Sequence, residues 1–139
     1  MVGSRRKARM IALQALYEAD AVGHEAEAAL ENLLPGAGLS AESSLFAREL
    51  VAGVVQHRDK IDHHIRDHAP AWPLDQIPAV DRNVLRLALF EVLIDNRVPV
   101  KVGINEAVEL AKAFGSDSSP KFINGVLGSV SALANREKS

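Results

Sequence analysis

The chain has 139 residues, of which 47% are hydrophobic and 24% charged, and its formal net charge is −2. These values fit one ordinary globular domain, or two small subdomains that share a core, and exclude a disordered chain. Cysteine is absent, which excludes disulfides, thiol nucleophiles and cysteine-ligated metal sites. No apolar run approaches the roughly 20 residues that cross a bilayer, and the basic N-terminus has no apolar signal region behind it. We therefore expect a cytoplasmic protein.

Helical periodicity dominates the N-terminal half. Apolar residues form two stripes between about residues 4 and 21, which indicates a largely buried helix. A short helix is expected at about 25–34, stopped by the Pro35-Gly36-Ala37-Gly38 run. A longer helical pattern spans about 41–68, with Ser40 as its N-cap. The polar residues 56–60 are the place where that pattern would break in two.

The run Pro70-Ala71-Trp72-Pro73 cannot lie inside a helix, so we place a hinge there and divide the chain into domains 1–69 and 70–139. The next helix, about 78–95, is apolar in every direction and should be the enclosed, central helix of the second half.

Two further helices complete the expected fold. One spans about 100–114, after Pro99, and Gly115 is its expected C-cap. The last begins at Ser118 or Ser119, and its apolar face should consist of Ile123, Val126, Leu127, Val130 and Leu133. No segment is a convincing strand. The sequence thus predicts an all-α protein, with two small helical bundles packed together and about seven helices.

The first helix begins with four cations, which we call the basic tip: Arg5, Arg6, Lys7 and Arg9. Cations are unfavourable at a helix N-terminus, because the helix dipole is already positive there. The arrangement suits an anion, and nucleic-acid phosphate is the natural partner. The alternative is a solvated, frayed terminus.

A second candidate for nucleic-acid binding is the segment from Gly115 to Asn124. It combines small hydroxyls at Ser118 and Ser119 with Lys121 beside Phe122, and an aromatic next to a lysine can stack on an unpaired base. The alternative is a core residue beside a routine helix cap.

Polar residues also interrupt the apolar central helix. Asp81, Arg82 and Arg86 are either an ordinary solvated face or the rim of a partner surface. Glu91 is best explained as a structural anchor and less well as a catalytic acid, because no second catalytic group accompanies it on that helix.

No enzyme active site can be recognised in the chain. Four histidines between residues 57 and 68 lie near Asp62 and Asp67, but they form no known metal motif and have no obvious third ligand. Phosphate-binding loops and nucleophile elbows are absent from the sequence. We expect neither catalysis nor a cofactor nor a metal.

Three segments resemble the NusB transcription antitermination family: SRRKARMIALQALYEAD at 4–20, VDRNVLRLALFEVL at 80–93 and VPVKVGINEAVELAKAFGSDSSPKFINGVLG at 98–128. The resemblance implies an all-helical fold of two bundles and a non-enzymatic factor. Such a factor binds the single-stranded boxA element of nascent ribosomal RNA jointly with NusE, a small-subunit ribosomal protein. It acts with other Nus factors on elongating RNA polymerase and suppresses premature termination.

The resemblance also implies roles for particular residues. The basic opening of the family maps onto the basic tip, and its RNA surface near the last helix maps onto Lys121 and Phe122. Its acidic contact with NusE maps onto Asp81. Some relatives carry an acid where this chain has Ser118.

Two other hypotheses remain open at this point. One is a helical protein-interaction or dimerisation module without RNA affinity, although a homodimer would fit either interpretation. The other is an accessory domain of an RNA-modifying enzyme, since ribosomal-RNA cytosine methyltransferases carry a NusB-like domain. We expect this second alternative not to apply, because no catalytic domain follows Ser139.

Overall fold

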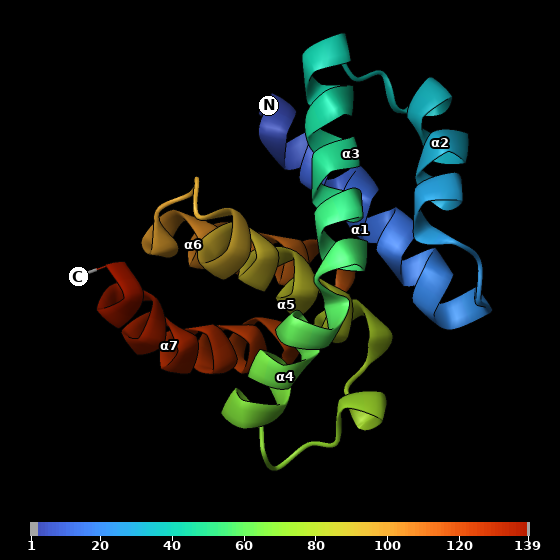
Figure 1. Cartoon of the computed structure of the whole chain (residues 1–139). Helices are drawn as coiled ribbons and strands as arrows, with labels where there is room; N and C mark the ends of the chain where they lie inside the picture. Colours follow the sequence, from blue (N-terminus) through green and yellow to red (C-terminus); the bar gives the residue numbers. More distant parts are fainter. Residues whose placement is uncertain (1–2, 139) are drawn as a thin grey trace. The chain divides into compact units, whose positions relative to one another are not determined.

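The computed structural model describes residues 3–138, with side chains described as far as residue 132. Within this range every regular element is helical, which confirms the all-α class (Figure 1). The chain divides into two compact units between Gln56 and His57. This boundary differs from the one that the Pro70–Pro73 run predicts, between residues 69 and 70. The difference is helix α4 (Arg58–His68), which packs against α5 (Ala79–Leu89) and α7 (Ser119–Lys138) and so belongs to the second unit.

The first unit contains three mutually packed helices: α1 (Ser4–Val22), α2 (Ala26–Ala37) and α3 (Ala41–Gln56). Alanines on α1 allow close helix contact, and larger apolar side chains of α2 and α3 fill the core; the buried set includes Ala8, Ala12, Ala15, Leu30, Leu34, Leu50, Val51 and Val54. Gly23, in the left-handed conformation at φ 84°, ends α1, and its N–H donates to the carbonyl of Ala19.

Two expectations about the ends of these helices have different outcomes. Ser40 is the N-cap of α3 as predicted, because its hydroxyl accepts the Ser43 N–H at 3.1 Å. The Pro35–Gly38 run does end α2, but the helix continues beyond the expected residue 34 to Ala37 and ends at Gly38, which has φ 70°. A proline removes only one helical hydrogen bond, and its φ is compatible with a helix, so the last turn survives.

The second unit surrounds helix α5 with α4, α6 (Val100–Phe114) and α7, which confirms α5 as the central helix. A short 3₁₀ turn, η1 (Leu74–Gln76), precedes α5. The apolar face of α7 is buried as expected at Ile123, Val126, Leu127 and Val130. Leu133, expected on the same face, lies outside the residues whose side chains are described.

The central helix ends in a wide π-helical segment, η2 (Phe90–Asp95). The N–H of Asn96 reaches back five residues to the carbonyl of Glu91 at 3.0 Å, and Asn96 itself is left-handed at φ 58°. Helix α6 passes close to this segment at Gly103, where a Cβ atom would lie 2.5 Å from Cγ2 of Val92. An alanine at position 103 would therefore force the Val92 side chain or the helix to shift, so glycine suits the close approach of the two elements.

Candidate nucleic-acid interface

The basic tip occupies the first two turns of α1. Gly3 is the N-cap residue, so no side chain caps the helix, and the first turn holds no acid. Arg5 and Lys7 are exposed and Arg6 is half-buried. These side chains therefore add positive charge at the end of the helix where the dipole is already positive, and this favours an anionic partner.

An aromatic ring on α3 organises the tip. The guanidinium carbons of Arg5 and Arg9 lie 4.6 and 5.3 Å from the ring centroid of Phe46, so two cations one helical turn apart share one aromatic ring. Arg9 is only 5% exposed. It was predicted as an RNA contact, but the structure places it in the packing of this unit. Phe46 was not among the predicted site residues, although its aromatic identity was an available signal.

The loop between α6 and α7 is held by a serine. The hydroxyl of Ser119 accepts the N–H of Ser116 at 2.9 Å, and Ser119 is buried. A Cβ atom on Gly115 would lie 2.6 Å from Cβ of Ser119, so the loop closes tightly on this side chain. Gly115 ends α6 in an extended conformation. Ser119 was predicted at the RNA surface, but it is buried and stabilises the loop by this hydrogen bond. Ser118 is exposed.

A groove lies within the second unit, beside the start of α7. It has a volume of about 540 Å³ and is lined by two segments, the end of α4 with the residues that follow it and the first turns of α7. His68 and Trp72 come from the first segment, and Ser118, Lys121 and Phe122 come from the second. The structure therefore brings three predicted RNA-binding residues together with an exposed tryptophan that sequence analysis assigned only to a hinge.

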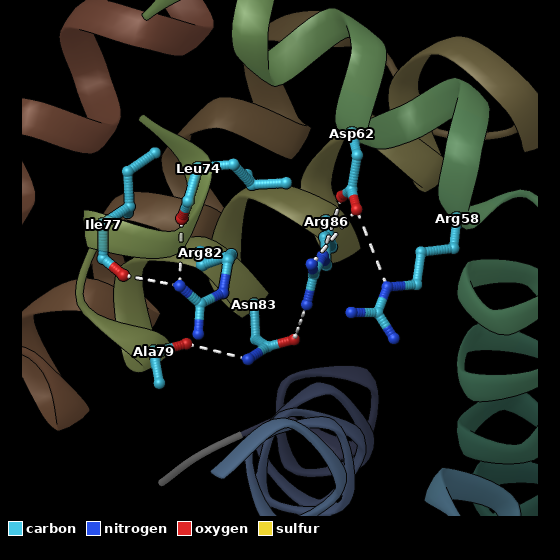
Figure 2. Close-up of polar contacts among 8 residues, drawn as sticks. All are labelled: Arg58, Asp62, Leu74, Ile77, Ala79, Arg82, Asn83 and Arg86. Atoms are coloured by element: carbon cyan, nitrogen blue, oxygen red, sulfur yellow. Dashed lines mark hydrogen bonds and ion pairs between the residues drawn. The ribbon is translucent and has the colours of Figure 1, made fainter. Parts of the chain in front are cut away.

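Figure 2 shows a polar network that involves Arg82 and Arg86, two of the residues considered as a partner surface. The Arg86 guanidinium donates to both carboxylate oxygens of Asp62, from Nε at 2.9 Å and from Nη2 at 3.1 Å, and also to Oδ1 of Asn83 at 3.2 Å. Arg86 was expected on a partner surface, but it is buried. It joins α5 to α4 from inside, because a buried charge needs a partner of opposite charge.

Arg82 also serves the second unit internally. Its Nη1 donates to the carbonyls of Leu74 at 3.0 Å and Ile77 at 2.8 Å (Figure 2). These carbonyls belong to the η1 turn and its end, so Arg82 fixes that turn against the beginning of α5. The side chain is half-buried, and part of it stays accessible to a partner.

The comparisons with known proteins agree with one another. The NusB family model matches residues 6–132. The chain belongs to the NusB family. It is 55% identical over 139 residues to "Transcription antitermination protein NusB" of Dehalococcoides mccartyi, which covers 99% of this chain and 97% of the relative.

Solved NusB structures have the same fold as this NusB-family chain. T. maritima NusB is 34% identical, with a TM-score of 0.85 and coverage of 94% of this chain and 92% of that one. The NusB of a complex of antitermination factors NusB and NusE with double-stranded RNA is 27% identical, with a TM-score of 0.84 and coverage of 94% and 97%.

Asp81 is the residue that the NusB resemblance assigns to NusE. It lies in the first turn of α5 and is buried, and within the described residues its Oδ1 atom has no hydrogen-bond partner. A buried acceptor that lacks a donor is costly, and burial leaves little of this side chain accessible to the partner contact that was expected.

The remaining candidates of this NusB-family chain do not form a second site. Glu91 is buried in η2 and does not line the groove. His57 stacks on Phe90, and His63 pairs with Asp67 at 3.2 Å. Among the described residues, no three potential ligands are close enough to hold a metal ion.

None of the helices found between residues 3 and 138 combines the length and apolar character that crossing a bilayer requires.

Proposed function

We propose that this chain is a non-enzymatic transcription antitermination factor. It binds the single-stranded boxA element of nascent ribosomal RNA jointly with NusE, and acts with other Nus factors on elongating RNA polymerase in the cytoplasm. Membership of the NusB family supports this assignment, as do relatives that carry the name of antitermination protein. A related NusB occurs in a complex with NusE and RNA.

The observation that carries the proposal is the exposed positive charge of the basic tip. Arg5 and Lys7 are exposed at a helix end whose first turn contains no acid, although the chain as a whole is negative. Net charge would repel RNA, so binding requires a local cationic surface. Phosphate contacts of this kind give affinity, and sequence preference for boxA must come from contacts with unpaired bases.

The test compares a boxA-like RNA with a scrambled RNA of the same length, each with and without NusE. Wild type should prefer boxA, and NusE should tighten binding. Arg5→Gln/Lys7→Gln should weaken binding of both RNAs and make the log–log salt slope shallower by about 0.7 for each RNA phosphate that the variant no longer neutralises. The variant should stay folded for two reasons. Glutamine has a high helix propensity, and removal of cations from this helix end relieves an unfavourable interaction with the dipole.

Lys101→Gln/Lys112→Gln is the matched control, because it removes the same charge from exposed positions on α6. This control should retain wild-type affinity. Equal affinity of wild type for the two RNAs, together with no effect of the Arg5 and Lys7 substitutions, would contradict the proposal. A helical protein-interaction module without RNA affinity would then be the better description.

A further inference from the structure

The sole tryptophan of the chain is held in an exposed position. Trp72 is 53% exposed, although large aromatic side chains gain most when they are buried. Its backbone N–H donates to the carbonyl of Ala69 at 3.1 Å, and prolines at positions 70 and 73 flank it. These restraints fix the backbone around the indole, so a ligand that covers the ring orders little additional chain.

The second segment that lines the groove, at the start of α7, carries the complementary chemistry. Lys121 is exposed and Phe122 is half-buried, both in the first turns of α7. His68 closes one side, and its Nδ1 atom forms a 2.8 Å hydrogen bond with the hydroxyl of Ser129. Among the described residues that line the groove, none is an acid. An occupant that fits this lining is flat, aromatic and negatively charged.

We propose that this groove holds one nucleotide of single-stranded RNA, with its base stacked on the indole of Trp72 and its phosphate near Lys121. The volume of about 540 Å³ lies within the range of roughly 300–1,000 Å³ that is typical of small-ligand sites. A base within a duplex is already stacked between its neighbours, so only an unpaired nucleotide can enter. The proposal rests on the RNA-binding function proposed above and adds Trp72 as a base-stacking residue.

Intrinsic fluorescence tests the proposal directly, because Trp72 is the chain's single tryptophan. Titration of wild type with single-stranded boxA-like RNA should change the Trp72 emission in proportion to the bound fraction, which is measured separately by anisotropy of labelled RNA. A duplex of the same sequence should leave the emission unchanged. Trp72→Ala should weaken single-strand binding about tenfold, since stacking on an aromatic residue is typically worth this much or more per base.

Two further variants control for folding and for general loss of apolar surface. Trp72→Phe keeps a flat ring and should retain most of the affinity. Leu45→Ala removes a side chain of similar exposure, 55%, from α3 and should bind like wild type.

RNAs that each carry one abasic nucleotide locate the stacked base. An abasic nucleotide at one position should weaken binding to wild type, and the same RNA should bind Trp72→Ala no more weakly than the unmodified RNA does.

The outcomes separate this proposal from the function on which it rests. If RNA binds but Trp72→Ala keeps wild-type affinity and the emission does not change, the groove is not a base site and the RNA-binding function stands. If no single-stranded RNA binds to any variant, the RNA-binding function fails and this proposal fails with it. An emission change with NusE alone and none with RNA would assign the groove to a protein and overturn the proposal.

Discussion

Replacement of Asp62 by asparagine tests the buried ion pair between α4 and α5. The Asp62 and Arg86 side chains are 8% and 4% exposed, and the carboxylate accepts two hydrogen bonds, at 2.9 and 3.1 Å. Asparagine has the same shape but no charge, and its amide group would face an arginine donor. Removal of one partner from a buried pair costs about 3–5 kcal/mol, because the other charge stays buried. That loss is a large part of the roughly 5–15 kcal/mol that stabilises a typical domain.

Two comparison variants test whether this loss of stability comes from the buried pair. Arg58 approaches Asp62 at 3.6 Å but is 54% exposed, so Arg58→Ala should cost no more than about 1 kcal/mol. The double variant Asp62→Leu/Arg86→Met replaces both charges with apolar groups and should recover most of the loss. Urea unfolding followed by circular dichroism gives the free energy of unfolding for each variant. A cost below about 1 kcal/mol for Asp62→Asn, or a double variant no more stable than it, would refute the reasoning.

Three other substitutions probe separate features. Phe46→Leu keeps an apolar side chain but removes the ring under the basic tip, so RNA affinity should fall about two- to fivefold at an unchanged salt slope; unchanged affinity would contradict this. Hydrogen bonds from Arg48 lower the pKa of Glu31 below its ordinary 4.5, so the pair stabilises the fold above pH 4.5 and loses this effect as the pH falls through the lowered pKa. Glu31→Gln should therefore lower the thermal midpoint at pH 7 and change it less at pH 3. Gly103→Ala should destabilise the protein by about 1–2 kcal/mol through contact with Val92, and Val92→Ala in the same chain should relieve the loss; denaturant unfolding measures both.

Much of the fold is local and could be predicted. The period of apolar residues indicated every α-helix, and the N-cap at Ser40 and the central position of the helix that follows Pro78 were also foreseen. Errors occur where one local signal competes with another. Pro35 is a strong helix breaker in general, yet the last turn of α2 tolerates it. The break between α3 and α4 was located from the sequence. The unit that α4 joins was not predicted, because that depends on packing between distant segments.

The candidate interface was predicted only in part, for the same reason. A charge pattern identifies arginines, but it does not distinguish exposed Arg5 from buried Arg9 and Arg86, whose partners lie on other helices. The groove is formed by segments about 50 residues apart in the chain, so no local pattern could link Trp72 with Phe122. Their proximity is a property of tertiary structure alone.

The wide segment at the end of the central helix restricts how the length of this chain can vary. Its Asn96–Glu91 hydrogen bond spans five residues, one more than in an α-helix. Deletion of one residue between positions 90 and 95 would favour the ordinary spacing and rotate the following segment by about 100° relative to the helix. Deletion of a single residue should therefore be tolerated less well between positions 90 and 95 than in the loop around Gly23. That loop lies between two helices and can change length without rotating either helix.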